Sequence, residues 1–288
     1  MPPRWLVLEV EAPVEEDLRA LVVEELLALP TRGVEERPGL LIAYFPGVEE
    51  SSPDQVVNQV RERIRQATGV EAPILHHRWQ DHEEWGESWR RGLRVRRITD
   101  RLVVSPSWED PDPAPGELVI VLDPGMAFGT AEHPTTRGCL RLLDRTVAPG
   151  ERVADIGAGS GILSIAAALL GADRVVALEM DPWALAAARE NVVTNGVEDR
   201  VQVVEGEVDA GFLPEEPPFD GIVSNIEAGV LTRLLAGFRT GLRPGGWLIL
   251  SGIMAHEVPQ IVDEATRAGF ALRDEDREGD WWSGLLEG

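Results

Sequence analysis

The sequence predicts an α/β protein in which a Rossmann-like domain follows a small α+β domain of ferredoxin-like topology. Three observations predict this fold. Strand-like and helix-like segments alternate through residues 117–288, as they do in folds built on a parallel sheet. A glycine-rich turn in that region joins a short apolar strand to an apolar helix. Residues 1–77 instead follow the order β-α-β-β-α-β, which is typical of a ferredoxin-like module.

Chain length and composition agree with two domains. The 288 residues exceed the usual size of one domain, and a hydrophobic fraction of 43% supports a substantial core. We place the first domain at 1–77, an inter-domain region at 78–116 and the second domain at 117–288. A single cysteine, Cys139, excludes an internal disulfide and suits a reducing compartment. Because we find neither a signal-peptide pattern nor an apolar run of transmembrane length, we expect a cytoplasmic protein.

The formal net charge of −23 bears on the kind of partner that the protein binds. A protein that binds nucleic acid through its phosphates requires a clustered basic surface, so we expect no direct nucleic-acid binding. A basic protein partner matches the charge better, although acidity also serves solubility alone. All 27 basic residues are arginine, which we interpret as compositional bias.

The first domain is predicted from alternating and helical apolar patterns. Strands are expected at 5–10, weakly at 33–37, at 39–45 and at 72–77, with helices at 14–29 and 55–68. Proline and an acid at the start of the second helix support that assignment. Since the module shows no catalytic constellation, we interpret it as a docking module.

Tryptophans and arginines are interleaved across residues 78–108. Such interleaving can mark RNA binding. We favour a structural interpretation, in which a helix at about 81–91 packs its tryptophans against the second domain and pairs its arginines with acids there. Trp85 and Trp89 are four residues apart and therefore share one helical face. The proline- and acid-rich residues 109–116 are typical of a linker.

The central stretch of the second domain is a strand, a glycine turn, a helix and a second strand. The first strand, 152–156, runs into the turn Gly157-Ala158-Gly159-Ser160-Gly161, and an apolar helix follows at 162–170. Glycines let backbone approach a ligand closely, and the helix behind them directs unpaired N–H groups at it. The next strand, 174–178, ends before Glu179, which lies 22 positions after Gly157, where doubly wound folds place a ribose-binding carboxylate.

The glycine spacing leaves more than one cofactor open. The dinucleotide fingerprint is G-x-G-x-x-G, whereas this turn reads G-x-G-x-G after Asp155. An acid is a poor neighbour for a pyrophosphate and a good one for an ammonium or sulfonium group. The pattern therefore favours S-adenosylmethionine over NAD, and a glycine-rich turn without a ligand is the remaining alternative.

The other elements of the second domain follow from apolar periodicity and turn residues. Strands are expected at 118–122, 201–205, 219–224 and 247–250, and helices at 137–145, 182–195, 229–242 and 256–269. A last strand at 280–287, reversed relative to the others, completes the predicted sheet.

Polar residues follow two of these strands. Residues 123–136 are too polar for a core, and Thr135 and Thr136 begin the next helix with a threonine as a plausible N-cap. His133 is a candidate base, but no second ligand stands at metal-binding spacing, so no metal is expected. Asn225 ends a predicted strand and lies at the sheet edge where open α/β sheets bind ligands.

Four segments of the chain point to one family. They are Asp123 to Thr136 (DPGMAFGTAEHPTT), Asp155 to Leu163 (DIGAGSGIL), Asn225 to Ala228 (NIEA) and Leu250 to Ile253 (LSGI). On these segments the chain resembles the ribosomal protein L11 methyltransferase family, PrmA, across nearly its whole length. The glycine motif is common to many methyltransferases, whereas the F-G-T-x-x-H-P-T-T segment is specific.

The resemblance implies an S-adenosylmethionine-dependent methyltransferase domain, preceded by a ferredoxin-like domain that recognises a large-subunit ribosomal protein. It implies methylation of amino groups, on lysine side chains and on the N-terminal amine, and we expect a monomer. The residues expected to contact or border S-adenosylmethionine are Phe128, Gly129, Thr136, Asp155, Gly157, Gly159, Glu179 and Asn225. Asn225 is also the candidate catalytic residue, because its side-chain carbonyl can accept a proton from the amine and aim the lone pair.

The chain departs from the family pattern at three places. Ala131-Glu132 replaces glycine-threonine, Glu179 replaces the ribose-binding aspartate, and Glu227 replaces a leucine. Glu179 keeps the carboxylate of the aspartate on a side chain that is longer by one methylene. Glu132 and Glu227 add charge near the amine site, where they would hold a lysine ammonium or signal another amine substrate.

Three alternative functions follow. The first is a protein-lysine methyltransferase of the same fold that acts on a different protein. The second is a protein that senses the methyl donor without turning it over. The third, an NAD-dependent dehydrogenase, is disfavoured by Asp155 and by the glycine spacing.

Overall fold

The computed structural model divides the chain into two compact units, residues 1–92 and 93–288, and each is described by itself. The structure describes residues 4–13, 15–27, 29, 31, 34–37, 39–45, 53–69, 75–81, 93–123, 129–206 and 218–288.

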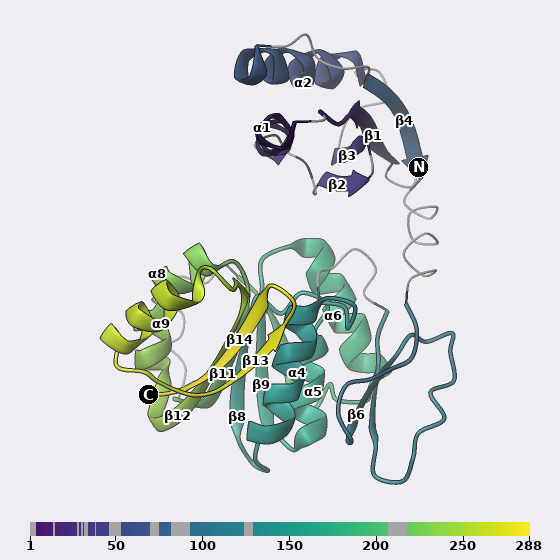
Figure 1. Cartoon of the computed structure of the whole chain (residues 1–288). Helices are drawn as coiled ribbons and strands as arrows, with labels where there is room; N and C mark the ends of the chain where they lie inside the picture. The colour runs from purple at the N-terminus through teal and green to yellow at the C-terminus, as the bar shows by residue number, and fades with distance from the viewer. Residues whose placement is uncertain are drawn as a thin grey trace. The chain divides into compact units, whose positions relative to one another are not determined.

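The first unit is a four-stranded antiparallel sheet with two helices (Figure 1). Its elements are β1 (Arg4–Glu11), α1 (Glu16–Leu27), β2 (Val34–Arg37), β3 (Leu40–Phe45), α2 (Pro53–Thr68) and β4 (Leu75–Asp81). The strand order is β2-β3-β1-β4, and every neighbouring pair is antiparallel. The predicted order of elements is therefore confirmed, including the weak strand β2.

The end of this unit differs from the prediction. The last strand runs to Asp81 and not to His77, because its pairing with β1 continues as far as Arg4 opposite Asp81. Asp81 thus ends a strand, and the rest of the helix predicted at about 81–91 lies outside the described residues.

The core of the first unit follows from the two periodicities of its sequence. Leu6 and Leu8 alternate along β1, are fully buried and belong to this cluster, while Val7 on the opposite face is buried as well. Val57, Val60 and Ile64 recur at helical spacing on α2 and are buried in the same cluster.

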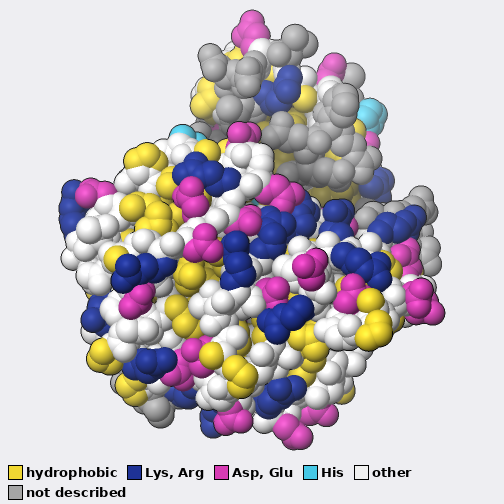
Figure 2. Space-filling view, turned by 60° about the horizontal axis from the view of Figure 1, so that its bottom comes forward, with side chains coloured by type: hydrophobic (Ala, Val, Ile, Leu, Met, Phe, Trp, Pro, Cys, Tyr) yellow, Lys and Arg dark blue, Asp and Glu magenta, His cyan; other side chains and the backbone are white. Residues whose placement is uncertain are grey.

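A small sheet opens the second unit. It contains β5 (Arg96–Arg97), β6 (Leu102–Ser105) and β7 (Leu118–Val121), with β6 parallel to β7. Arginines around this sheet pair with carboxylates: Arg94 with Glu109, Arg97 with Glu117 and Arg101 with Asp144. On the face drawn in Figure 2, basic and acidic side chains likewise lie next to one another. These ion pairs agree with the structural interpretation of the arginines.

The main sheet has seven strands in the order β10-β9-β8-β11-β12-β14-β13. Its elements are α4 (Pro134–Thr146), β8 (Arg152–Ile156), α5 (Ile162–Leu170), β9 (Arg174–Glu179), α6 (Pro182–Thr194), β10 (Val201–Glu205), β11 (Phe219–Asn225), α8 (Ala228–Gly241), β12 (Leu242–Met254), α9 (Val258–Arg267), β13 (Ala271–Glu278) and β14 (Trp281–Glu287). The five strands from β10 to β12 are parallel, and β14 is antiparallel to both neighbours. This confirms the reversed last strand, whereas β13 was not predicted.

Helices cover both faces of the main sheet (Figure 1). Alternate strand residues face opposite ways, so Val153 packs in a cluster with α4 and α5, while Ala154 packs in a second cluster with α8 and α9. None of the described helices is both long and apolar enough to cross a membrane.

The strand order places a crevice at the middle of the sheet. From β8 the chain first moves outward to β9 and β10, and then returns to add β11 and β12 on the other side. Open α/β sheets bind their ligands beyond the carboxyl ends of the strands at such a switch point. The carboxyl ends of β8 and β11 are therefore where a site is expected.

Candidate active site

A cavity of about 750 Å³ lies at these carboxyl ends. Its wall contains six of the predicted site residues: Gly129, Thr136, Gly157, Gly159, Glu179 and Asn225. Phe128 lies outside the described residues. Asp155 is not among the described residues that line the cavity. The wall thus joins residues that the sequence separates by nearly one hundred positions.

The glycine turn depends on left-handed backbone. Gly157, Gly159 and Gly161 have φ of 75°, 56° and 82°, a region that residues with a Cβ rarely adopt. A Cβ at Gly157 would lie 2.5 Å from Cγ2 of Ile226, which also lines the cavity. Glycine is therefore required at this position both for its backbone angle and for its closeness to Ile226, which follows β11.

Glu179 closes the turn from the next strand. Its carboxylate accepts hydrogen bonds from the backbone N–H groups of Gly159 (2.8 Å), Met180 (2.8 Å) and Asp181 (2.9 Å). A carboxylate has about four acceptor positions, so capacity remains for a ligand hydroxyl. The turn and the acid are consequently held in one arrangement before any ligand binds.

Asp155 is fully buried below the turn. Its Oδ2 accepts a hydrogen bond of 2.6 Å from the Ser164 hydroxyl, and its Oδ1 has no partner among the described residues. Burial raises the pKa of Asp155 to about 7, because the charged form loses its hydration. Direct contact between Asp155 and a cofactor remains a prediction.

Two residues of the cavity wall each hold a buried side-chain oxygen that has no hydrogen-bond partner among the described residues. The two oxygens are Oγ1 of Thr136 and Oδ1 of Asn225. A buried polar atom without a partner costs about 1–3 kcal/mol of folding free energy. Oxygens in this state are ready to accept or share a hydrogen bond with a polar ligand, and they fit the amino and hydroxyl groups of S-adenosylmethionine and of an amine acceptor.

His133 caps α4, where a threonine N-cap was predicted. The helix begins one residue earlier, at Pro134, and Nδ1 of His133 accepts from the backbone N–H of Thr135 at 3.4 Å. Its Nδ1 also lies 2.6 Å from the Thr135 hydroxyl. A proline at the first position needs no N–H partner, which explains the earlier start. The threonine cap was therefore wrong.

The His133 ring stands edge-on to the Trp281 ring, with 4.8 Å between their centroids, and both residues line the cavity. Burial, followed by the positive charge of Arg137, holds the pKa of His133 below its usual range. Sequence reasoning did not select Trp281. The only signal was its place beside a Gly-Asp turn, where an aromatic ring can reach a site.

The two additional acids have different surroundings. Glu132 forms a two-pronged ion pair with Arg96 and is not among the described lining residues. Glu227 precedes α8, is exposed, and lines the cavity. Of the two, Glu227 is thus the one whose charge is available to a ligand.

A buried asparagine supports the loop around Gly129. Asn191 donates to the carbonyl of Ser160 at 2.9 Å and accepts from the N–H of Asp123 at 3.1 Å. The Ser160 hydroxyl in turn donates to the carbonyl of Gly129 at 2.6 Å. Sequence reasoning missed Asn191, whose signal was a polar residue on the apolar face of a predicted helix.

The fold and the cavity together define a class of enzyme. A mainly parallel sheet with one reversed strand next to its edge, together with a glycine turn and a strand-end acid beside the switch point, is the Rossmann-like methyltransferase arrangement. A family model described as ribosomal protein L11 methyltransferase (PrmA) matches residues 16–286, and the chain belongs to this family.

Individual relatives agree with the family model. A protein of Chloroflexus aurantiacus described as ribosomal protein L11 methyltransferase is 44% identical over 220 residues, covering 69% of this chain and 67% of that protein. A protein of Symbiobacterium thermophilum with the same description is 45% identical over 241 residues, covering 78% of this chain and 75% of that protein. The crystal structure of a ribosomal protein L11 methylase from Lactobacillus delbrueckii subsp. bulgaricus is similar with a TM-score of 0.62 and 33% identity, over 67% of this chain and 98% of that one.

Proposed function

We propose that this enzyme transfers the methyl group of S-adenosylmethionine to amino groups of ribosomal protein L11, on lysine side chains and the N-terminal amine. One observation carries the proposal within the family assignment. The two unpartnered buried oxygens of Thr136 and Asn225 share a single cavity with the glycine turn and Glu179. Groups for a methyl donor and for an amine acceptor are therefore present in one site.

The residues of the turn would hold the donor. Glu179 has acceptor capacity for ribose hydroxyls, and Gly157 and Gly159 let the ligand approach the backbone closely. When bound, S-adenosylmethionine supplies an electrophilic methyl group on a sulfonium. The rest of the reaction concerns how the chain presents a neutral amine.

A lysine amine with a pKa near 10.4 is protonated at neutral pH, and making it neutral at pH 7.4 costs about 4 kcal/mol. Loss of hydration in a cavity with a mainly apolar lining favours the neutral form of the amine and lowers this cost. Oδ1 of Asn225 accepts an N–H of the amine, so that the nitrogen lone pair points at the methyl group. His133, on the same wall, is a candidate acceptor for the departing proton.

Glu227 supplies the charge that attracts the protonated amine at the rim. The variant Glu227→Gln should raise KM for the protein acceptor about threefold to tenfold and leave kcat nearly unchanged, because a rim charge acts mainly on encounter. Steady-state kinetics at low salt measures this. Glu132→Gln is the matched control and should leave KM unchanged. An unchanged KM in Glu227→Gln contradicts this role.

The first unit is proposed to be a ferredoxin-like docking domain for the ribosomal protein. Its support is the β-α-β-β-α-β order, the antiparallel sheet and a separate core. None of its described residues lines the cavity. We therefore keep the proposed order of a docking domain, an inter-domain region and a catalytic domain, but move the first boundary from residue 77 to beyond Asp81, where β4 ends.

The experiment that tests the function is methyl transfer from a labelled donor. Purified enzyme is incubated with labelled S-adenosylmethionine and a mixture of unmodified ribosomal proteins, and labelled residues are mapped by mass spectrometry. Label on lysines or the N-terminal amine of L11 is the expected result. Label confined to another protein supports the alternative acceptor, and donor binding without any transfer supports a sensor.

A further inference from the structure

Helix α4 and strand β13 are joined by a ladder of ion pairs. Arginines recur every four residues along α4, and acids recur every two residues along β13: Arg137, Arg141 and Arg145 face Glu278, Asp276 and Asp274. Four residues of helix and two residues of strand both advance about 6–7 Å, so the two spacings match. The ladder runs from the exposed pair Arg145–Asp274 toward the cavity.

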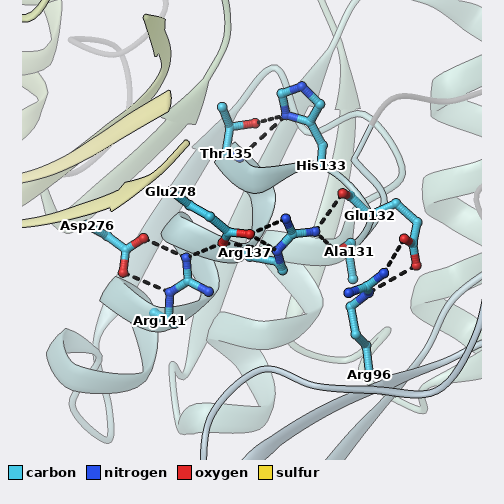
Figure 3. Close-up of polar contacts among 9 residues, drawn as sticks. All are labelled: Arg96, Ala131, Glu132, His133, Thr135, Arg137, Arg141, Asp276 and Glu278. Carbon is cyan, nitrogen blue, oxygen red and sulfur yellow. Dashed lines mark hydrogen bonds and ion pairs between the residues drawn. The ribbon is translucent and has the colours of Figure 1, made fainter. Parts of the chain in front are cut away.

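The rung nearest the cavity differs from the others. The Arg137 side chain is only 13% exposed. Its guanidinium donates to the Glu278 carboxylate and, through Nη1, to the backbone carbonyls of Ala131 (2.7 Å) and Glu132 (2.6 Å) (Figure 3). One planar group with five donors therefore binds two separate segments at once.

Each of these segments carries one aromatic residue of the cavity wall. The carbonyls of Ala131 and Glu132 belong to the loop that ends at His133. Glu278 stands directly opposite Trp281 in the β13–β14 pairing. The two segments meet where the rings of His133 and Trp281 lie 4.8 Å apart.

The ion pair at this rung stays charged under ordinary conditions. The hydrogen bond from Arg137, with a further contribution from Arg141, lowers the pKa of Glu278 to about 2 despite partial burial. Close packing supports the same arrangement, since a Cβ at Gly138 would lie 2.3 Å from the Ser283 hydroxyl oxygen. The helix and the hairpin are thus pressed together beside the rung.

We propose that Arg137 is a positioning residue of the methyl-transfer site, which sets the distance between the His133 loop and the Trp281 hairpin. The inference rests on the proposed function, in which His133 accepts the proton of the amine, and it assigns the adjoining Trp281 ring to the same amine. Arg137 acts through His133 and Trp281 and is not itself among the described residues that line the cavity.

The kinetic test compares three single variants. Arg137→Gln and Arg137→Lys should lower kcat for methylation of L11 at least tenfold, with the Kd for S-adenosylmethionine within twofold of the parent. Lysine fails because a point charge cannot bind a carboxylate and two carbonyls together. Arg141→Gln is the matched control: it removes the ion pair with Asp276 and one hydrogen bond to Glu278, but leaves the contacts of Arg137 with Glu278 and with the two carbonyls, so it should keep kcat within twofold.

A charge exchange separates positioning from a simple ion pair. Arg137→Glu combined with Glu278→Arg restores opposite charges, but Glu cannot donate to the carbonyls of Ala131 and Glu132. The double variant should recover part of the Tm that Arg137→Glu alone loses, since the arginine introduced at position 278 also lies beside Arg141. It should not recover kcat. Recovery of kcat, an unchanged kcat in Arg137→Gln, or an equal loss in Arg141→Gln each overturns the proposal.

The distance between the His133 and Trp281 rings can be followed by NMR, which requires no methyl acceptor. In the full chain, the NMR cross-peak between the His133 and Trp281 rings should be present in the parent and in Arg141→Gln, and absent in Arg137→Lys. The His133 signal is assigned with His133→Gln. A cross-peak that persists in Arg137→Lys overturns the positioning role, whereas failure of the parent to methylate L11 refutes the proposed function alone.

Discussion

A buried oxygen without a hydrogen-bond partner lowers the stability of a folded protein by about 1–3 kcal/mol. Within the described part of the chain, Thr136 and Asn225 each hold such an oxygen on the cavity wall. Functional sites commonly contain groups that lower the stability of the fold, because those groups are placed for contacts with a ligand. The two residues should therefore behave unlike ordinary core residues when they are truncated.

The variant Asn225→Ala should lower kcat about 100-fold, the range seen when one positioned hydrogen-bond group is removed. Its Tm should be unchanged or higher, because the buried carbonyl that lacks a partner is deleted. Single-turnover methylation and calorimetry measure the two effects. A large fall in Tm with unchanged kcat contradicts the assigned role.

Asp155 makes a pH-dependent contribution to stability. Its pKa rises from 3.8 in the unfolded chain to about 7 in the folded chain because of burial. The folded state thus binds more protons between these values, so this group destabilises the fold progressively as pH rises from about 4 to about 7. The free energy of unfolding of Asp155→Asn, taken relative to that of the parent, should be higher at pH 8 than at pH 5. Urea unfolding at both pH values tests this, and an equal difference at the two values rejects it.

The elements around the glycine turn could be predicted because their signals are local. Apolar strands, glycines and an apolar helix of usual length define β8 and α5, whose bounds agree with the prediction. Glu179 and Asn225 follow from their places at strand ends. Local pattern thus sufficed for the side of the cavity that holds the glycine turn.

The side of the cavity that holds His133 and Trp281 could not be predicted in the same way. Strand β13 reads ALRDEDRE and has no apolar alternation, because its inward acids meet the arginines of α4 and not an apolar core. Its partner hairpin strand carries Trp281, so the position of that ring also depended on tertiary pairing. The first turn of α4 was misassigned since His133 replaces the usual hydroxyl cap.

Gly157→Ala tests the turn as an element. The left-handed φ and the nearby Ile226 side chain should together destabilise the chain by about 1–3 kcal/mol. The Kd for S-adenosylmethionine should rise more than tenfold, because the turn must shift to accommodate the alanine side chain. Gly196→Ala is a useful control, since it has a positive φ of 63° but nothing within 4 Å. Equal donor affinity in both variants argues against the turn as the donor site.

At the scale of the whole molecule, each unit has a core of its own. A chain truncated to residues 93–288 should keep its Kd for S-adenosylmethionine within about threefold, because every described cavity residue is retained. Methylation of L11 should fall at least 100-fold when the docking domain is removed. Calorimetric titration and the labelled-donor assay measure the two properties. Full activity of the truncated chain contradicts docking by the first unit.

The ladder between α4 and β13 has a consequence for the working range of the enzyme. Its cations are all guanidinium groups, which keep their charge at any alkaline pH that a protein survives. Lysine acceptors become better nucleophiles as pH rises toward 10, because more of them are neutral. Lysines in the same places would lose their charge over that range. The walls of the cavity are thus held by contacts that persist under the conditions in which the substrate amine is most reactive.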